Sequence, residues 1–193
     1  MNQDEIVGLL EANGAILRGH FVLSSGRHSD VFVQKFRVLE HPELARSFGE
    51  LISGSFGGSF DVVAAPAVGA LVLGFCTALA ADCRFVFAER VDDEMRFRRG
   101  FEIAPGERTL VVEDVITTGG SAGEVVELVR RVGGEPIGLG ALIDRGDPAR
   151  ILDVGVPLKA LVALQVGSWA VGDCPLCAAN EPIDDPGSRR LST

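Results

Sequence analysis

Hydrophobic and polar positions along the chain follow two periodic patterns, one typical of helices and one typical of strands. Apolar positions in residues 3–12 recur on one helical face, which predicts a short amphipathic helix. From residue 15 to residue 36, apolar and polar positions alternate around a turn at 24–26, so two strands joined by a loop are predicted. A proline near the start of residues 42–53 is placed to open a second helix.

After residue 60 the pattern becomes a repeated order of strand, loop and helix. Apolar runs predict strands at 61–65, 84–88, 109–113 and 137–144, with helices at 71–81 and 122–132. This alternation predicts an α/β fold with a mostly parallel central sheet flanked by helices. Ligands of such sheets bind at the carboxyl ends of the strands, which directs attention to the loops at 65–70, 89–100 and 114–121.

The same pattern divides the 193 residues into three parts. We expect an N-terminal segment at 1–36, an α/β core at 37–172, and an irregular tail at 173–193 that carries a C-x-x-C. Hydrophobic residues make up 47% of the chain and charged residues 23%, which permits a sizeable core.

Charge and composition exclude several classes of protein. The net charge of -9 argues against a nucleic-acid-binding surface, which would be basic. No run of residues approaches the roughly 18 apolar positions of a membrane span, and the acidic N-terminus does not resemble a secretory signal. Four cysteines are too few for a disulfide framework. We therefore expect a cytoplasmic protein without a nucleic-acid or membrane partner.

The chemistry concentrates in residues 110–121, LVVEDVITTGGS. Glu113 and Asp114 form an acidic pair at a strand end, which is costly unless the pair binds sugar hydroxyls or lies near a divalent cation. The following hydroxyls and glycines at 117–121 open a helix, where backbone N–H groups and the helix dipole suit a phosphate. A ribose 5-phosphate would fit both the acidic pair and the loop at 117–121. The alternative is a helix that is capped by Ser121 and binds no ligand.

This string resembles the phosphoribosyl-pyrophosphate (PRPP) motif of the type I phosphoribosyltransferases. The resemblance implies that the acidic pair holds the ribose hydroxyls, that the next loop holds the 5-phosphate, and that the loop after the first core strand faces the pyrophosphate. The implied PRPP contacts are Glu113, Asp114, Val115, Ile116, Thr117, Thr118, Gly119, Gly120, Ser121, Ala67, Val68 and Gly69.

Two further segments are similar to orotate phosphoribosyltransferases. Residues 19–33, GHFVLSSGRHSDVFV, follow their G-x-F-x-L-x-S-G-x-x-S stretch, which forms a small N-terminal hood over orotate. ALIDRG at 141–146 resembles a strand end whose arginine meets the orotate carboxylate, and a guanidinium suits that role. The alternative for this arginine is a surface position after a strand. The implied orotate contacts are Ser25, Gly26, Thr117 and Arg145.

The chain departs from the family in its lysines. Gly69 stands where many members carry a lysine in the pyrophosphate loop, and Ser24 replaces another lysine. The loop at 89–101 contains arginines in place of the mobile-loop lysines, and arginine cannot donate a proton. The resemblance assigns catalysis to Asp114 with Arg90, Arg98 and Arg99, and Arg96 adds charge. The alternative is a solvated hairpin balanced by Asp92, Asp93 and Glu94.

The resemblance implies transfer of phosphoribosyl from PRPP to orotate in pyrimidine biosynthesis, by a homodimer that uses Mg²⁺. Because Mg²⁺ binds largely through substrate oxygens and waters, no protein ligand for a metal is assigned. The alternatives are a purine-type salvage phosphoribosyltransferase, which would lack the hood pattern, and a nonenzymatic PRPP-binding regulator, which would lose the acceptor contacts.

Cys174 and Cys177 have the spacing of a zinc-ligand pair, but a structural zinc ion needs four ligands. His20, His28 and His41 are distant in sequence, so a zinc site, a metal shared across a dimer and a labile disulfide all stay open. His28 is either a substrate contact or a loop hydrogen bonder.

Overall fold

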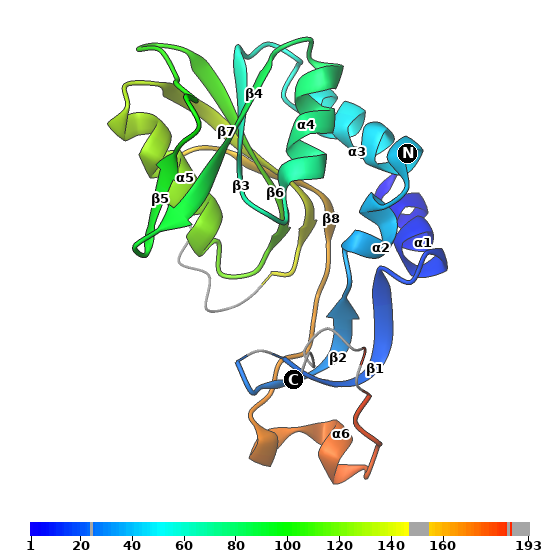
Figure 1. Cartoon of the computed structure of the whole chain (residues 1–193). Helices are drawn as coiled ribbons and strands as arrows, with labels where there is room; N and C mark the ends of the chain where they lie inside the picture. The colour runs from blue at the N-terminus through cyan, green and yellow to red at the C-terminus, as the bar shows by residue number, and fades with distance from the viewer. Residues whose placement is uncertain (24, 147–154, 185, 187–193) are drawn as a thin grey trace.

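The computed structural model describes residues 1–23, 25–146, 155–184 and 186. Figure 1 shows a sheet covered by helices, with a strand hairpin and the C-terminal segment below it. The parallel strands point their carboxyl ends toward this lower part, so the site expected at that edge of the sheet lies between the two parts.

The central sheet has six strands in the order β5-β4-β3-β6-β7-β8. All neighbours pair in parallel except β5, which returns antiparallel beside β4. The strands are β3 (Val62–Pro66), β4 (Arg84–Val91), β5 (Glu94–Phe97), β6 (Arg108–Ile116), β7 (Glu135–Asp144) and β8 (Leu158–Ala163). The predicted α/β fold with a mostly parallel sheet is confirmed.

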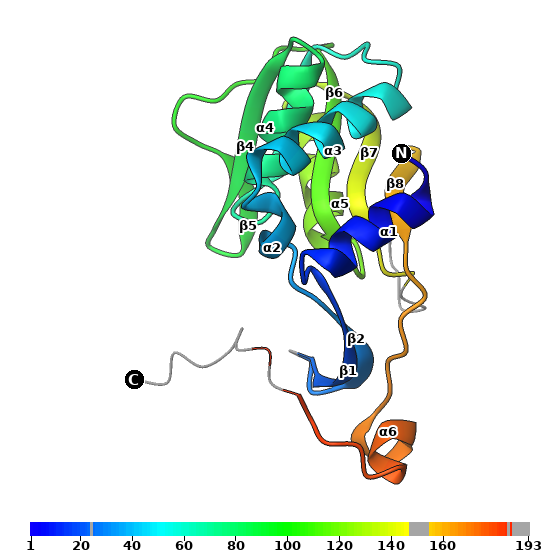
Figure 2. The same ribbon diagram turned by 90° about the vertical axis from the view of Figure 1, so that its right-hand side faces the viewer.

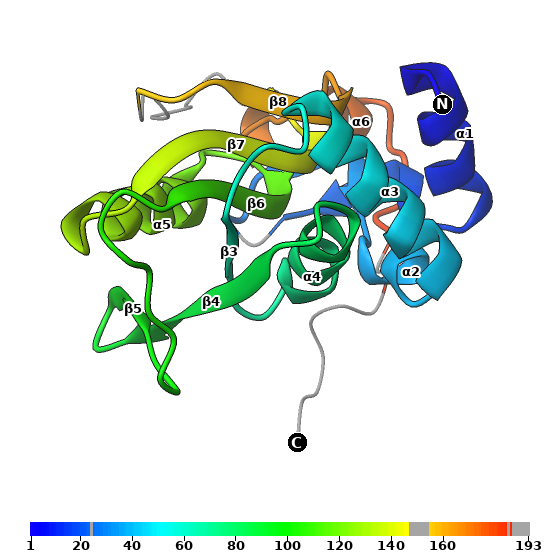
Figure 3. The ribbon, with the colours of Figure 1, turned by 90° about the horizontal axis from the view of Figure 1, so that it is seen from above.

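Helices cover both faces of this sheet, as the view from above shows (Figure 3). On one face, Leu110 and Val112 of β6 pack in a core that α1, α3 and α4 share. On the other face, Val111 packs with residues of α5. Because successive strand residues face opposite ways, the uninterrupted apolar run of β6 is needed. The helices are α1 (Gln3–Ala12), α2 (Phe36–Leu39), α3 (Pro42–Ser55), α4 (Leu71–Ala80) and α5 (Gly120–Arg131).

The hairpin of β1 (Ile16–Val22) and β2 (His28–Val33) forms a separate two-stranded sheet. The C-terminal segment, with a 3-10 turn (Val171–Asp173) and α6 (Pro175–Ala178), lies against this hairpin in both side views (Figures 1 and 2). Helix α1 precedes the hairpin in sequence, yet its Ile6 and Leu10 belong to the core beneath α3. The division of the chain at residues 36 and 172 stays a prediction.

The predicted helices and strands are all present, with shifted ends. β6 continues to Ile116, so the loop predicted to begin at residue 114 begins at Thr117. The expected loop at 89–100 is largely the β4–β5 hairpin, and the tail expected to be irregular contains α6. These elements, with α2, were missed because four residues are too few to show a period. In the described part of the chain, no helix is both long and apolar enough to cross a bilayer.

Candidate active site at the carboxyl ends of the strands

Asp114, Lys35 and Gly69 meet on the side of the sheet that α4 covers. Asp114 is only 2% exposed, and its Oδ1 accepts the backbone N–H of Val115 at 2.6 Å. Its Oδ2 is paired with the ammonium group of Lys35, which enters from the end of β2. A Cβ atom on Gly69 would lie 2.5 Å from Lys35 Nζ and closer still to Asp114 Oδ2. The loop after β3 therefore touches the carboxylate only because residue 69 has no side chain.

Lys35 was missed in the sequence. It is one of only two lysines in the chain, and it directly follows the alternating segment of the second strand. The sequence signal that could have identified Lys35 was a single lysine at the end of a hood strand. Only the tertiary structure brings this lysine to Asp114. It supplies positive charge beside the Gly69 loop, where the sequence indicated that a lysine was lacking.

Glu113 lies on the opposite face of β6, within a pocket open to solvent. Residues 115–122, from the end of β6 through the first turn of α5, line this pocket with Glu113 and Glu124. Burial and the adjacent charge of Asp114 raise the pKa of Glu113 to about 8. The backbone N–H of Asp114 donates to Glu113 Oε1 at 3.0 Å, which offsets only part of that effect. Near neutral pH, the pair of Glu113 and Asp114 therefore holds one more proton than two carboxyl groups with ordinary pKa values would hold.

This raised pKa predicts that the protein becomes less stable as pH rises. A glutamate in the unfolded chain has a pKa of about 4.3, so below that pH both states hold the proton. Between about pH 4.3 and the folded pKa of about 8, only the folded state keeps it. Glu113 alone should therefore lower the free energy of unfolding by at most about 1.4 kcal/mol per pH unit across this window.

Denaturant unfolding at several pH values measures this slope, and Glu113→Gln should flatten it. Glu135→Gln, at the exposed start of β7, is the matched control and should keep the wild-type slope. A wild-type slope in Glu113→Gln would show that Glu113 does not titrate in this window.

The loop from Thr117 to Gly119 leads directly into α5. Gly119 is the N-cap with φ of 85°, a left-handed conformation that favours glycine, and no side chain caps the helix. The alternative of a helix capped by Ser121 is therefore wrong, because Ser121 already lies within the first turn. The residues of this turn line the pocket, and the free N–H groups and positive dipole end of a helix N-terminus suit a phosphate.

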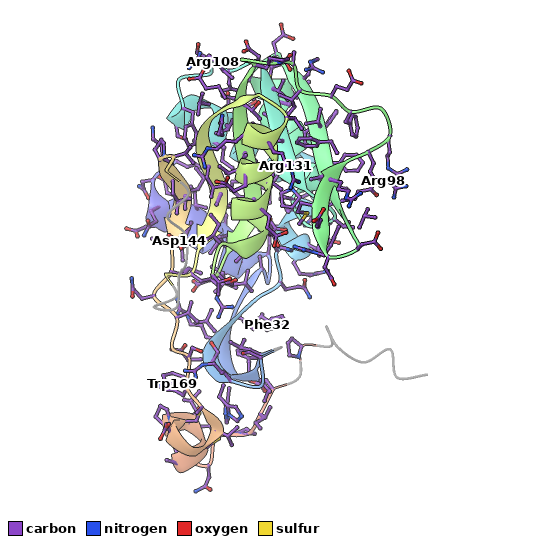
Figure 4. All side chains as sticks on the ribbon, turned by 90° about the vertical axis from the view of Figure 1, so that its left-hand side faces the viewer. Phe32, Arg98, Arg108, Arg131, Asp144 and Trp169 are labelled. Carbon is purple, nitrogen blue, oxygen red and sulfur yellow. The ribbon has the colours of Figure 1, made fainter. Side chains whose placement is uncertain are left out.

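Thr117 and Arg145 come together because β6 and β7 are neighbours. Ile116 pairs with Asp144 across the sheet, and the backbone N–H of Arg145 donates to Ile116 O at 2.9 Å. The residues that follow the two strands therefore begin side by side at the carboxyl edge, and Asp144 is labelled there in Figure 4. The structure thus brings two of the four predicted orotate contacts together.

The other two predicted contacts lie at the turn of the hood hairpin. Ser25 and Gly26 are exposed, and Gly26 has φ of 76°. Within the described ranges, no hydrogen bond or ion pair joins either residue to the pocket at 113–122. Ser24 lies outside the described residues. The predicted roles of Ser25 and Gly26 stay predictions.

The arginine-rich segment is a hairpin on the edge of the sheet, and most of its arginines have acidic partners. Arg90 pairs with Glu124 of the pocket at 2.7 Å, and Arg99 pairs with Glu89 at 2.8 Å. Arg96 pairs with Glu94 at 3.1 Å, whereas Arg98 projects away from the sheet (Figure 4). Arg90 thus lies at the pocket of its own chain, while Arg98 and Arg99 do not. The catalytic roles of Arg90, Arg98 and Arg99 stay predictions. The ion pair between Arg96 and Glu94 is one that the alternative, a solvated hairpin, also predicts.

The acidic pair does not form a metal cage of its own, so a magnesium ion at this site would be held mainly by substrate oxygens. Glu113 Oε1 accepts a backbone N–H, and both oxygens of Asp114 are engaged with Val115 and Lys35. Two carboxylates on opposite faces of one strand do not make an octahedral cage, and Mg²⁺ commonly binds through one or two carboxylates plus substrate phosphates.

Comparisons with known proteins agree with this geometry. Residues 37–153 match the family model described as the phosphoribosyl transferase domain. The chain is 44% identical over 192 residues to an orotate phosphoribosyltransferase of Caldanaerobacter subterraneus, covering 99% of this chain and 100% of that one. A relative of the same name from Pelotomaculum thermopropionicum is 46% identical with the same coverage. The solved orotate phosphoribosyltransferase of Aeropyrum pernix superimposes with a TM-score of 0.72 at 28% identity, covering 83% of this chain and 94% of that one.

Proposed function

Because the chain belongs to the phosphoribosyl transferase family, we propose that it transfers the 5-phosphoribosyl group from PRPP to orotate. The products are orotidine 5'-monophosphate and pyrophosphate, in pyrimidine biosynthesis. The observation that carries the proposal is the buried acidic pair of Glu113 and Asp114 near the end of β6, followed by the glycine-containing loop at the N-terminus of α5.

The donor half of the proposal rests on how these groups are spaced along β6. Glu113 and Asp114 offer acceptors for vicinal ribose hydroxyls on the two faces of the strand. Thr117 to Ser121 offer hydroxyls and backbone N–H groups for the 5-phosphate one loop further on. The loop of Ala67, Val68 and Gly69, with Lys35 beside it, faces the pyrophosphate. In a chain of net negative charge, the hydrogen-bond donors of these two loops and the Lys35 ammonium group thus lie where the phosphate groups of PRPP would bind.

In the proposed reaction, a ring nitrogen of orotate displaces pyrophosphate from the anomeric carbon of PRPP. The transition state has oxocarbenium character, as at other glycosyl carbons. The chain's own residues bind and orient both substrates, and the buried carboxylate of Asp114 favours the positive ribose ring. Arg90, Arg98 and Arg99 are proposed to balance the leaving group. When bound on substrate oxygens, Mg²⁺ supplies further neutralisation of the pyrophosphate.

The proposed binding of orotate depends on Arg145, so a substitution of Arg145 should affect the KM for orotate much more than the KM for PRPP. Arg145→Ala should raise the KM for orotate on the order of 10-fold to 100-fold, because a charged hydrogen bond contributes about 1.5–3 kcal/mol. The KM for PRPP should change little. Steady-state kinetics with each substrate varied in turn measures both values. Equal shifts in the two KM values would show that Arg145 is not the carboxylate partner.

The direct test of the proposal is an absorbance assay for loss of orotate in the presence of PRPP and Mg²⁺. Parallel reactions contain hypoxanthine or adenine in place of orotate. Loss of orotate alone supports the proposal, and consumption of a purine base in its place would identify the purine-type salvage enzyme. PRPP binding without turnover of any base would identify the nonenzymatic regulator.

We also propose that the enzyme is a cytoplasmic homodimer. Val72, Phe75 and Leu79 form an exposed apolar stripe along α4, and a helix that is apolar all round is usually buried. A partner chain on this stripe would cover it. All four cysteines are free, which suits a reducing compartment. Sedimentation equilibrium should give twice the chain mass of 20.4 kDa.

A further inference from the structure

Two histidines and two cysteines that are distant in sequence meet beneath the hood hairpin. His20 lies on β1 and His28 begins β2, while Cys174 and Cys177 lie at the start of α6 and within it. One ligand atom from each residue lies within 4.8 Å of every other. Figures 1 and 2 show α6 beside the hairpin in both views. The two ligands that the C-x-x-C lacks in the sequence are therefore supplied by the hood.

Three of the distances between these atoms match the edges of a tetrahedron around a metal ion. Both sulfur atoms lie 3.6 Å from His20 Nε2, and Cys177 Sγ lies 3.3 Å from His28 Nδ1. Ligands at about 2.0–2.3 Å from a tetrahedral zinc ion are about 3.3–3.8 Å apart. The two ring nitrogens lie closer together, at 2.7 Å, so a bound ion would move the imidazoles slightly apart.

The surroundings prepare His20 as a ligand. Its Nδ1 lies 2.9 Å from the backbone oxygen of Glu181. A carbonyl only accepts hydrogen bonds, so Nδ1 donates to it, and Nε2 is the ring nitrogen that faces the cluster. Metal-binding histidines typically have such a partner on the second nitrogen. His28 is 4% exposed, and its Nδ1 faces this cluster 2.7 Å from His20 Nε2, whereas a role as a substrate contact stays a prediction.

Burial makes a bare cluster costly and a bound cation favourable. His20 and Cys174 are 2% and 3% exposed, and buried polar groups require partners. Two thiolates balance the charge of a divalent cation, which leaves a neutral unit in the interior. A set of two sulfur and two nitrogen ligands in tetrahedral order selects zinc.

We propose that His20, His28, Cys174 and Cys177 bind one Zn²⁺ ion as a closed structural site. With four protein ligands no position is open for water or substrate, which distinguishes a structural from a catalytic zinc site. The proposal stands on this cluster alone and does not depend on the reaction that the enzyme catalyses.

The ion would fasten the C-terminal segment to the hairpin. An isolated two-stranded hairpin is only marginally stable in water. Here His28 and Trp169 exchange backbone hydrogen bonds of 2.8 and 2.9 Å, and the N–H of Asp184 donates to His20 O at 2.7 Å. Trp169 is labelled beside the hairpin in Figure 4. A metal between these contacts would make hairpin and tail one unit, so metal binding should contribute to folding free energy.

The first test is the metal content of the wild-type protein, purified without chelators from cells grown with zinc. Mass spectrometry of the metals should find about one zinc per chain. Cys174→Ser and Cys177→Ser should lose most of this zinc. Cys76→Ser and Cys83→Ser are matched controls, because these free cysteines lie outside the cluster, and both should retain it.

A second test uses Co²⁺, which does not require the cysteine variants to fold. Wild-type protein stripped by a chelator under reducing conditions and refilled with Co²⁺ should show thiolate charge-transfer bands and the intense visible bands of tetrahedral cobalt. Stripping should also lower the melting temperature, and Zn²⁺ should restore it. Wild-type protein without zinc that also fails to bind Zn²⁺ or Co²⁺ would overturn the proposal. So would a disulfide between Cys174 and Cys177 in freshly isolated protein, found as two reactive thiols in place of four after denaturation.

Discussion

Asp114→Asn should reduce kcat/KM for PRPP on the order of 10²-fold to 10³-fold while the fold is retained. The carboxylate is buried, and its two oxygens hold the Val115 N–H and the Lys35 ammonium. An amide can keep one of these bonds but turns an N–H group toward the ammonium or toward the ribose hydroxyls. Two hydrogen bonds to a charged group contribute together about 3–6 kcal/mol, and the lower half of this range corresponds to a loss of about 10²-fold to 10³-fold, because the amide keeps part of the original bonding.

The measurement is steady-state kinetics together with thermal unfolding. Asp82→Asn is the matched control, because Asp82 is exposed at the opposite end of the sheet and its φ of 50° suits asparagine. That control should have wild-type activity. Unchanged kcat/KM in Asp114→Asn would rule out Asp114 as the ribose ligand.

Gly69→Ala should reduce activity by about 100-fold with a smaller effect on stability. The new Cβ would lie 2.5 Å from Lys35 Nζ and would also overlap Asp114, so the ion pair must move. Both obstructing groups are the ends of side chains, which can yield, so overpacking should cost about 1–3 kcal/mol. A displacement of about 1 Å at a binding group can nevertheless cost on the order of 10²-fold in rate.

Gly8→Ala is the matched control for this change. Gly8 lies in α1, and an added Cβ would meet nothing within 4 Å. Kinetics and denaturant unfolding of both variants separate loss of function from loss of fold. Wild-type activity in Gly69→Ala would mean that the contact between the loop and Asp114 is not needed for catalysis.

The local pattern of the chain was sufficient for the core of the fold. Long apolar strands and periodic helices bury their own faces, so β6, β7 and α5 could be predicted without any partner in view. Strand ends were less predictable, because pairing with β7 extends β6 past Asp114 to Ile116. Short elements such as β5 and α6 carry too little periodicity in their own residues, and α6 also depends on neighbours that are distant in sequence.

The sequence by itself determined the donor motif, because Glu113, Asp114 and the phosphate loop are consecutive residues whose geometry follows from one strand entering one helix. Only the tertiary structure decided which distant groups join them. It brought Lys35 to Asp114 across 79 positions, and it brought His20 and His28 to a C-x-x-C some 150 residues away. These contacts depend on how separate elements pack together, and the spacing of residues along the chain does not specify that packing.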